Sequence, residues 1–364
     1  METTGKKRIL VAPLDWGLGH ATRCIPVIRE LILLGDEVLI ACDGTVKQLL
    51  KKEFPELTYI PLQGYNIHYS TVLPLSFSMA LQVPKILRRI FIEHLQLKKI
   101  IHEHRISAVI SDNRYGLWNK KIQSVFITHQ VMIKCPPLLR FLEHFMYHIS
   151  KIFIGKYQEC WIPDDERKLS GDLSHRFPIP LNAKFIGTLS RWKGEKKYTG
   201  EKKYDVIGIV SGPESHRTSF EKILVEQFRN SNLHALVVLG KPGEKTDIQI
   251  TDRLRLVSHL ESKKLLEAIL ASGLVICRAG YSGIMDLAAI GKEAILVPTP
   301  GQTEQVYLAK YLKEKKMFFS IEEKKFRLGD MENELKEYSI SIFQEIPDSL
   351  TKTISAWRKK ISES

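Results

Sequence analysis

The sequence predicts an α/β protein of two doubly wound, Rossmann-like domains, and three observations point to that fold class. At 364 residues the chain is too long for one ordinary core and suits two domains of roughly 150–200 residues. Short apolar strands alternate with helical stretches, as in parallel sheets that are covered on both faces. This alternation stops at a charged, glycine-bearing stretch, residues 189–203, and then restarts.

The restart sets the expected domain boundaries. We expect an N-terminal domain over 1–188, a linker over 189–203 and a C-terminal domain over 204–340. The remaining residues, 341–364, are expected to hold a helix that packs back on the N-terminal domain. Two doubly wound domains would place a cleft between facing strand ends, where such sheets bind ligands.

Each strand is predicted from a short run rich in valine, isoleucine and leucine. In the first half these runs are residues 8–13, 36–42, 58–62, 107–112 and 124–129. In the second half they are residues 204–212, 233–240, 252–260, 273–280 and 293–301. Helical periodicity predicts helices over residues 21–34, 46–53, 79–104, 138–157 and 348–361.

Composition narrows the class of protein. Hydrophobic content of 44% with 26% charged residues is typical of a soluble globular protein, and no run of 18 apolar residues spans a bilayer. No charged leader precedes an apolar core and cleavage site, so we expect no secretory signal. Five scattered cysteines without CxxC spacing indicate reduced thiols in the cytoplasm and no zinc site.

Positive charge is concentrated in the first half of the chain. Up to Lys193 there are 27 Lys and Arg against 17 Asp and Glu, within a total net charge of +13. A basic N-terminal half suits a polyanion or an anionic membrane surface. The alternative is a basic surface with no particular partner.

The first strand is followed by "PLDWGLGHATR", which places two glycines and a histidine where the first helix should begin. Gly17 and Gly19 permit a tight turn, and His20 is the side chain best suited to accept a proton near pH 7. The motif is not a dinucleotide fingerprint, because Thr22 stands where the third glycine would be. The alternative role for His20 is to cap the helix that follows.

The most informative stretch of the second half is "CRAGYSGIMDLAAIGKEAILVPTPGQTEQ", residues 277–305. A buried strand ends there and Gly280 permits a turn, so the next three residues begin a helix whose free N–H groups favour a phosphate. Asp286 lies one turn further, at the reach of a ribose diol. Glu304 and Gln305 follow the next strand and are suited to sugar hydroxyls.

An earlier loop, "VSGPESHR", also follows a strand and begins a helix. It offers backbone N–H groups and Arg217 to the phosphates. Together these loops define one set of predicted donor-binding residues. These are Gly17, Gly19, Ser211, Gly212, Arg217, Arg278, Gly280, Tyr281, Ser282, Gly283, Asp286, Gln302, Glu304 and Gln305.

These motifs resemble the GT-B glycosyltransferases, in particular the family 28-like group with the lipid II-forming N-acetylglucosaminyltransferase and the UDP-glucuronosyltransferases. The resemblance spans most of the chain and is strongest at 8–30 and 274–310. It implies that Asp286 takes the place of the glutamate that binds the ribose, with a shorter side chain. It also implies a donor contact for Gln305 and, with a one-residue shift, a uracil contact near His259 and Leu260.

The resemblance also implies a glycine-rich loop and a histidine beneath the acceptor. An acceptor hydroxyl has a pKa far above 7, so its proton must be removed in the transition state, and a neutral imidazole suits that task. We therefore expect His20 to be the catalytic base, oriented by Asp112 at the end of a neighbouring strand. Asp15 is an alternative partner, and His129 is a rival base.

The acceptor is expected to bind the basic N-terminal half. Residues 73–99 and 136–153 combine apolar and aromatic side chains with Lys and Arg, as in segments that dock on an anionic bilayer. A lipid-linked acceptor then fits better than a small soluble one. The alternative is that both segments are ordinary amphipathic core helices.

The sequence thus predicts a cytoplasmic, inverting glycosyltransferase with a UDP-sugar donor, a hydroxyl acceptor and no cofactor. No metal is expected, both from the resemblance and because no DxD motif is present; Arg278 or Arg217 would stabilise the departing diphosphate. Two alternatives are a UDP-sugar epimerase of the same fold and a non-catalytic membrane recruiter. Nucleic-acid binding is not expected, since no RNP motif, zinc finger or recognition helix accompanies the charge.

Overall fold

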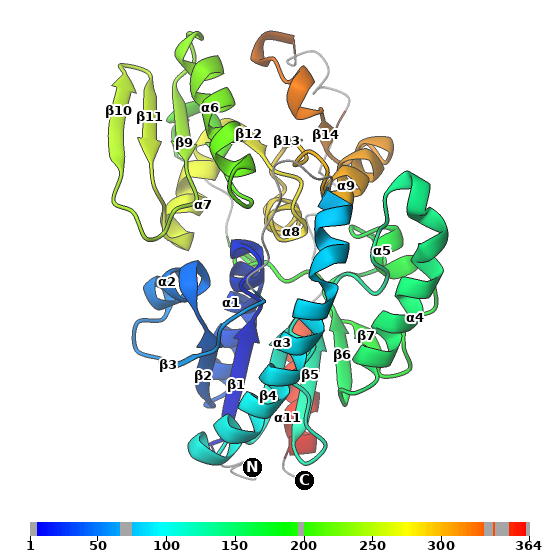
Figure 1. Cartoon of the computed structure of the whole chain (residues 1–364). Helices are drawn as coiled ribbons and strands as arrows, with labels where there is room; N and C mark the ends of the chain where they lie inside the picture. Colours follow the sequence, from blue (N-terminus) through cyan, green and yellow to red (C-terminus); the bar gives the residue numbers. More distant parts are fainter. Residues whose placement is uncertain (1–5, 66–74, 196–199, 331–337, 339–348, 362–364) are drawn as a thin grey trace. The chain divides into compact units, whose positions relative to one another are not determined.

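The computed structural model describes residues 6–65, 75–195, 200–330, 338 and 349–361, and the chain divides into two units. Unit 1 contains Met1–His68, Ser76–Leu189 and Pro347–Ser364, and unit 2 contains Tyr69–Leu75 and Ser190–Ile346. Within the described residues, each unit is built on one seven-stranded sheet (Figure 1). The predicted α/β fold class of two doubly wound sheets is confirmed.

The sheet of unit 1 is parallel throughout, in the order β3-β2-β1-β4-β5-β6-β7. Its strands are β1 Arg8–Pro13, β2 Glu37–Cys42, β3 Thr58–Pro61, β4 Ala108–Asp112, β5 Gln123–Ile127, β6 Glu159–Ile162 and β7 Ala183–Phe185. The central strands are buried along almost their whole length, as expected for apolar runs covered on both faces. The sequence prediction did not include the two short strands β6 and β7, of which β7 forms the edge of the sheet.

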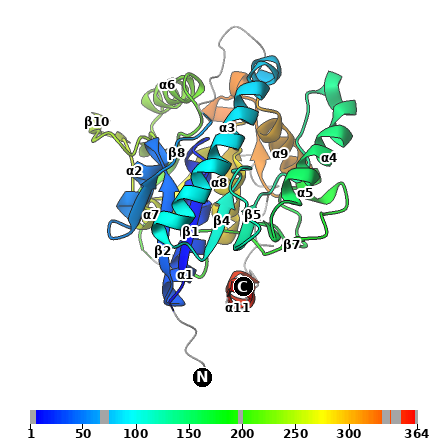
Figure 2. The ribbon, with the colours of Figure 1, turned by 60° about the horizontal axis from the view of Figure 1, so that its bottom comes forward.

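Helices cover both faces of this sheet. The helical elements of unit 1 are α1 Leu18–Leu33, α2 Gly44–Glu53, α3 Leu75–His104, η1 Pro137–Leu142, α4 Glu143–Ile154, α5 Asp172–His175 and α11 Ser349–Ile361. Figures 1 and 2 show the long helix α3 on one face and α1 with α11 on the other. Leu97 and Ile100 of α3 pack into the core formed by the central strands.

The last described helix, α11, is integrated into unit 1. Trp357 is fully buried, and its ring lies 5.5 Å from that of Trp161 on β6, edge to face. Arg358 pairs with the buried Asp36 at the start of β2. These contacts join the end of the chain to the N-terminal sheet, whereas residues 341–348 of the expected C-terminal segment, and its boundary at 340, lie outside the described residues.

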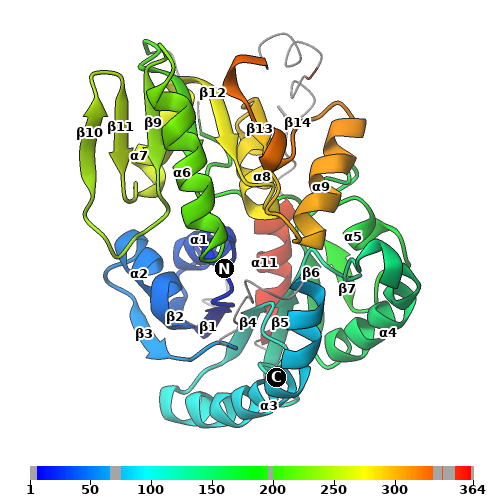
Figure 3. The same ribbon diagram turned by 45° about the horizontal axis from the view of Figure 1, so that its top comes forward.

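The sheet of unit 2 has the order β10-β11-β9-β8-β12-β13-β14, and only β10 is antiparallel to its neighbour among the described strands. Its strands are β8 Tyr204–Ile209, β9 Ala235–Val238, β10 Asp247–Thr251, β11 Leu254–Val257, β12 Ser272–Cys277, β13 Ala294–Leu296 and β14 Phe319–Ser320. Its helical elements are α6 His216–Arg229, α7 Ser262–Leu270, α8 Tyr281–Ala289, α9 Thr303–Glu314, η2 Glu323–Lys325 and η3 Leu328–Asp330. Figure 3 shows α6 and α7 on opposite faces of this sheet.

The segment expected to be a linker, residues 189–203, is packed against unit 2 at its start. Ser190 and Trp192 are buried, and the Trp192 indole Nε1 donates a hydrogen bond to the Ser262 carbonyl oxygen at 3.0 Å. The expected linker therefore begins with two buried side chains, Ser190 and Trp192. The high charge of the following residues hid this packing, while residues 196–199 lie outside the described part of the chain.

Helix α3 approaches the loop after β4 so closely that one position there requires glycine. A Cβ atom at Gly116 would lie 2.3 Å from the carbonyl oxygen of Ile90 and 2.7 Å from the Cβ of Glu93. Backbone atoms of a packed helix cannot yield at that distance. This contact fixes the spacing between α3 and the sheet edge.

We predict that Gly116→Ala lowers the free energy of unfolding of the protein by about 1–3 kcal/mol, the usual cost of overpacking. The control is Gly329→Ala, because a Cβ at that position would meet no atom within 4 Å. Denaturant titration followed by circular dichroism measures both variants. Equal stability of the two alanine variants would contradict the prediction.

Candidate active site

The loop after β1 and the end of β4 meet at one edge of the unit 1 sheet. The two strands are parallel neighbours, and Pro13 pairs with Asp112 in register. Helix α1 begins after Gly17, whose φ of 106° lies in the region that favours glycine. His20 therefore sits in the first turn of α1, directly beside the carboxyl end of β4.

The side chain of His20 faces Asp112. Its Nδ1 lies 2.7 Å from Oδ1 of the carboxylate, and 15% of the His20 side chain is exposed while none of the Asp112 side chain is. The interpretation of His20 as the helix cap is wrong. The N-cap residue is Gly17, and no side chain forms a capping hydrogen bond at this helix start.

Arg23, which sequence analysis did not single out, completes this cluster. Its guanidinium donates to both carboxylate oxygens of Asp112, and its Nη1 lies 2.8 Å from Nδ1 of His129. The sequence did contain a signal, because an arginine three residues after His20 lies on the same face of a helix. Arg23 is 1% exposed, so this is a buried cation and not a solvated surface charge.

Burial and the neighbouring charges determine the protonation states of the pair. Burial by itself raises the pKa of Asp112, but the charges and hydrogen bonds of Arg23 and His20 hold that pKa well below its ordinary range. Burial lowers the pKa of His20 and the charge of Arg23 lowers it further, against the opposing effect of Asp112. Near pH 7 the site therefore holds a carboxylate and a neutral imidazole.

Asp15, the alternative partner for His20, lies against another loop. A Cβ atom at Gly64 would fall 1.6 Å from Oδ1 of Asp15, so the aspartate side chain packs directly on that glycine. The structure thus places Asp112, and not Asp15, at Nδ1 of His20.

The predicted donor-binding residues of unit 2 gather at one edge of its sheet. Strands β11, β9, β8, β12 and β13 are parallel neighbours, so the loops after their carboxyl ends meet there. Ligands of such sheets bind at this edge. The loops carry Ser211, Gly212, His259, Leu260, Arg278, Gly280 and Gln302, and the first turn of α9 carries Glu304 and Gln305.

Helix α8 begins at this edge as the sequence predicts. Gly280 is its N-cap residue, and no side chain caps the helix there. Tyr281 is buried, Ser282 is partly exposed and Gly283 is exposed. The N–H groups of the first turn and the helix dipole make this a suitable place for an anion.

The loop between β13 and α9 holds buried polar atoms that have no partner among the described residues. The Gln305 side-chain oxygen accepts a hydrogen bond from the Thr299 backbone at 2.8 Å, which orders the loop. The hydroxyl of Thr299 and the side-chain oxygen of Gln302 are both buried and unsatisfied. A Cβ at Gly212 would lie 3.8 Å from that hydroxyl, so two loops converge on polar atoms that a ligand would satisfy.

Asp286 is not placed as the sequence predicts. Its carboxylate is buried and accepts hydrogen bonds from Ser190 Oγ at 2.9 Å, the Arg191 backbone at 3.3 Å and Arg191 Nε at 3.0 Å. Burial raises the pKa of Asp286, while Arg191 and Ser190 oppose that rise. Both carboxylate oxygens therefore hold the chain at residues 190–191, and the expectation that they face a ribose diol does not match this geometry.

The two arginines proposed for the diphosphate are also engaged within the protein. Arg278 is buried against the ring of Phe220, donates to the His216 carbonyl at 2.9 Å and pairs with Glu323 at 2.6 Å. Arg217 Nε donates to Glu214 at 2.7 Å. In this conformation local carboxylates and carbonyl oxygens engage both guanidinium groups, although Nε of Arg278 is buried without a hydrogen-bond partner among the described residues.

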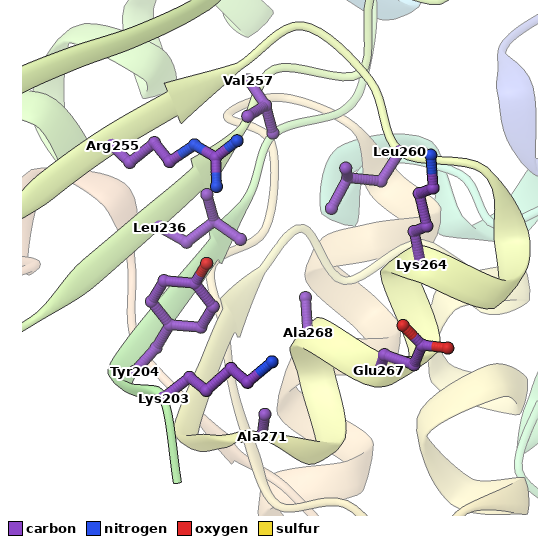
Figure 4. Close-up of a pocket in the computed structure, with 10 residues that line it drawn as sticks. All are labelled: Lys203, Tyr204, Leu236, Arg255, Val257, Leu260, Lys264, Glu267, Ala268 and Ala271. Carbon is purple, nitrogen blue, oxygen red and sulfur yellow. The ribbon is translucent and has the colours of Figure 1, made fainter.

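A pocket of about 220 Å³ opens on unit 2 between α7 and the sheet face beside it (Figure 4). Leu260 is the one predicted donor residue that lines it. The remaining lining residues are Lys203, Tyr204, Leu236, Arg255, Val257, Lys264, Glu267, Ala268 and Ala271. This pocket extends away from the edge at which the strand ends converge, so it is not the predicted nucleotide site.

Two further properties of the described residues bear on the site. No group of three or more His, Cys, Asp and Glu side chains in the described part of the chain is arranged to hold a metal ion. None of the described helices is long and apolar enough to cross a membrane.

Comparisons with known proteins agree with this architecture. Residues 219–355 match the model of the glycosyltransferase family 28 C-terminal domain. An uncharacterized glycosyltransferase of Methanosarcina acetivorans is 21% identical over 82% of this chain and 81% of that protein. The UDP-N-acetylglucosamine--N-acetylmuramyl-(pentapeptide) pyrophosphoryl-undecaprenol N-acetylglucosamine transferase of Alkaliphilus metalliredigens is 23% identical over 87% and 86%.

A solved structure has the same fold. The crystal structure of MurG from Acinetobacter baumannii superimposes with a TM-score of 0.57 and 14% identity, and the match covers 98% of this chain and 100% of that one.

Replacing Asp286 tests whether its carboxylate supports the fold or faces a ligand. We predict that Asp286→Ala lowers the free energy of unfolding by about 3–5 kcal/mol. The substitution removes the carboxylate that pairs with the guanidinium of Arg191, a side chain that is only 10% exposed to solvent. The matched control is Asp247→Ala, whose partner Arg255 is exposed, with an expected loss of about 1 kcal/mol or less. Chemical denaturation measures both. An Asp286→Ala protein of normal stability that binds UDP weakly would instead support the ribose role.

Proposed function

Since the chain is a family 28-like glycosyltransferase with the GT-B fold, we propose that it transfers a hexose or N-acetylhexosamine from a UDP-sugar to a hydroxyl acceptor with inversion. The observation that carries this proposal is the pair formed by His20 and Asp112 at the edge of the unit 1 sheet. A neutral imidazole fixed by a buried carboxylate is the arrangement that general base catalysis requires.

The reaction is a single displacement at the anomeric carbon. The acceptor oxygen forms a bond to that carbon while its proton passes to Nε2 of His20. The bond between the anomeric carbon and the phosphate oxygen breaks, and its electron pair leaves with UDP. Attack from the face opposite the diphosphate inverts the configuration. Removing the hydroxyl proton in this step contributes about 10²–10⁴-fold to the rate.

Asp112 makes Nε2 the reactive nitrogen of His20. When Nδ1 of a neutral imidazole carries the proton and donates it to a carboxylate, the lone pair resides on Nε2. The carboxylate also stabilises the imidazolium that forms as the proton arrives. The low pKa of Asp112 keeps it ionised throughout, so it orients the base without itself taking the proton.

We assign the donor to the loops at the edge of the unit 2 sheet. The first turn of α8 would accept the diphosphate. The unsatisfied hydroxyl of Thr299 would donate to a phosphate oxygen or bind a sugar hydroxyl, and the unsatisfied side-chain oxygen of Gln302 would accept from a sugar hydroxyl. We expect the backbone N–H groups, and not a metal ion, to stabilise the departing UDP. Catalysis then requires that the acceptor held beside His20 reaches the donor held on unit 2.

We further propose that the acceptor is presented at an anionic membrane surface. Val83, Leu87, Phe91 and Leu95 repeat at every fourth residue along α3 and are 47–63% exposed. Basic side chains at 85, 88, 98 and 99 are exposed along the same helix. The inner face of α3 packs in the core through Leu97 and Ile100, as the alternative of an amphipathic core helix expects, whereas this apolar stripe is exposed among the described residues.

The second segment, in η1 and α4, has the same pattern of exposed apolar side chains with basic neighbours. Leu138 and Phe141 are 91% and 74% exposed, and Phe145 and Ile152 are 61% and 66% exposed. Arg140 and Lys151 flank them. Apolar side chains with basic neighbours suit the headgroup boundary of an anionic bilayer.

Replacing the base tests the catalytic proposal. We expect His20→Ala to lower turnover about 10²–10⁴-fold and to leave UDP affinity nearly unchanged, because the imidazole faces the acceptor. Asp112→Asn should lower turnover less, since the base remains. The matched control is His102→Ala, an exposed histidine of α3. Turnover is measured with UDP-sugars and candidate acceptors, and UDP affinity by calorimetry.

A His20→Ala protein that transfers sugar at the normal rate would contradict the proposal that His20 is the catalytic base. Interconversion of a UDP-sugar without any acceptor would instead indicate an epimerase.

Liposome sedimentation tests the membrane surface. We expect binding to anionic vesicles at low salt and release as the salt rises, because exposed charges are screened beyond about 10 Å at 0.1 M. The double variant Phe141→Ser with Phe145→Ser should bind about a hundredfold or more weakly, since each buried aromatic ring contributes about 1.5–3 kcal/mol and about 1.4 kcal/mol is a tenfold change. The control is Ile248→Ser, an exposed apolar residue of β10. Equal binding to neutral vesicles would overturn the electrostatic part.

A further inference from the structure

The guanidinium of Arg23 contacts the side chains of Asp112, His20 and His129. From the second turn of α1 it donates to both oxygens of Asp112, at the end of β4. Its Nη2 lies 2.9 Å from Nδ1 of His20, and its Nη1 lies 2.8 Å from Nδ1 of His129, which follows β5. Cys24 also faces the carboxylate, with Sγ at 3.5 Å.

The hydrogen-bond donors of Arg23 determine which ring nitrogen of a neutral His129 carries the proton. A guanidinium has only N–H donors and no acceptor, so the nitrogen that faces it must offer a lone pair. His129 Nδ1 faces Arg23, and a neutral ring then carries its proton on Nε2. His129 therefore lacks a free lone pair on Nε2, which argues against it as the rival base.

His20 Nδ1 lies between a donor and an acceptor. An N–H at this atom satisfies Asp112 Oδ1 at 2.7 Å, whereas a lone pair satisfies Arg23 Nη2 at 2.9 Å. Arg23 Nη2 already donates to the same carboxylate oxygen, so its hydrogen bonding does not depend on His20. The N–H at Nδ1 thus satisfies the ionised carboxylate and leaves the Nε2 lone pair available.

We propose that Arg23 is a positioning residue for His20: its two-pronged hold on Asp112 aims one carboxylate oxygen at Nδ1, and its charge keeps the imidazole unprotonated. A histidine paired with a carboxylate alone gains affinity for a proton, because the carboxylate stabilises the imidazolium. Arg23 offsets that charge from inside the same cluster. The base is then neutral, and able to accept a proton, at a lower pH than an isolated pair allows.

The burial of the cluster makes this compensation effective. Arg23 is 1% exposed and Asp112 has no exposed surface, so neither charge is screened by solvent. Burial first, and then the charge of Arg23, lowers the pKa of His20, whereas Asp112 raises it. A merely structural ion pair would hold α1 on β4 without influencing when His20 takes up a proton.

The test measures the titration of His20 directly, without substrate, by NMR of ¹³C-labelled histidine, with His20→Gln used to assign its signal. We expect Arg23→Gln to move the His20 midpoint to higher pH, each unit corresponding to a tenfold gain in proton affinity. The matched control is Arg29→Gln, which removes an exposed arginine from the same helix and leaves the midpoint unchanged. An unchanged midpoint in folded Arg23→Gln overturns the electrostatic part of the proposal.

Two further variants separate charge from geometry. Arg23→Lys keeps the charge but loses the two-pronged geometry, so we expect the His20 midpoint to stay near that of the wild type while sugar transfer falls. Unchanged transfer in this variant overturns the positioning part. Asp112→Asn leaves the charge of Arg23 unopposed and should move the midpoint to lower pH, so a shift to higher pH contradicts the proposal even if Arg23→Gln fails to fold.

The proposal rests on the proposed function only in assigning a use to the Nε2 lone pair. If transfer is found, the acid limb of its pH profile should move to higher pH in Arg23→Gln, in parallel with the NMR midpoint. If no UDP-sugar is transferred by any variant while the midpoints move as expected, the proposed function fails and the role of Arg23 stands. If sugar is transferred but the midpoints do not move, the proposed function stands and the role of Arg23 fails.

Discussion

The buried carboxylate of Asp112 is the group around which the N-terminal site is organised. Moving a carboxylate out of water costs several kcal/mol unless it is paired and hydrogen-bonded. Here the compensation comes from Arg23 and His20, which lie one turn apart on α1. Because both donors belong to the start of one helix, the direction of α1 and the loop that precedes it are fixed relative to the end of β4.

Unit 2 contains a second buried carboxylate, which is also paired and hydrogen-bonded but which positions a chain segment instead of a histidine. Asp286 accepts hydrogen bonds from Ser190 and Arg191, which come from the segment just before β8. The hydrogen-bond partners of this carboxylate among the described residues are a serine and an arginine, and no histidine is among them. Its contribution is to hold residues 190–191 against α8, whose first turn faces the edge where strand ends converge.

A common physical rule explains why the chemistry lies at sheet edges in both units. Parallel strands deliver the loops after their carboxyl ends to one side of the sheet, where backbone N–H groups at helix starts remain available. The interior strands are apolar and buried, so polar side chains survive only where a strand ends. Asp112 with its partner His20 in unit 1, and the unsatisfied oxygens of Thr299 and Gln302 in unit 2, lie at or beside such strand ends.

The local chain composition determined much of this protein. Apolar runs bounded by glycine predicted the central strands of both sheets, and the resemblance carried by the two glycine-bearing loops predicted the GT-B fold and the glycosyltransferase class. The pairing of His20 with Asp112 was also within reach, because the carboxyl ends of parallel strands share an edge. Edge strands such as β7 were missed, since three residues carry no periodicity.

Tertiary contacts decided what each charged side chain does. The sequence alone allows two roles, binding a ligand or forming a buried ion pair, for each of Arg23, Arg191, Arg278 and Asp286. The nearest oppositely charged group in the folded chain determines which role each side chain has. That group lies 89 residues away for Arg23 and 95 residues away for Arg191. No local pattern encodes such a distance, because the partner is selected by the register of strands and the packing of helices, which exist only in the folded chain.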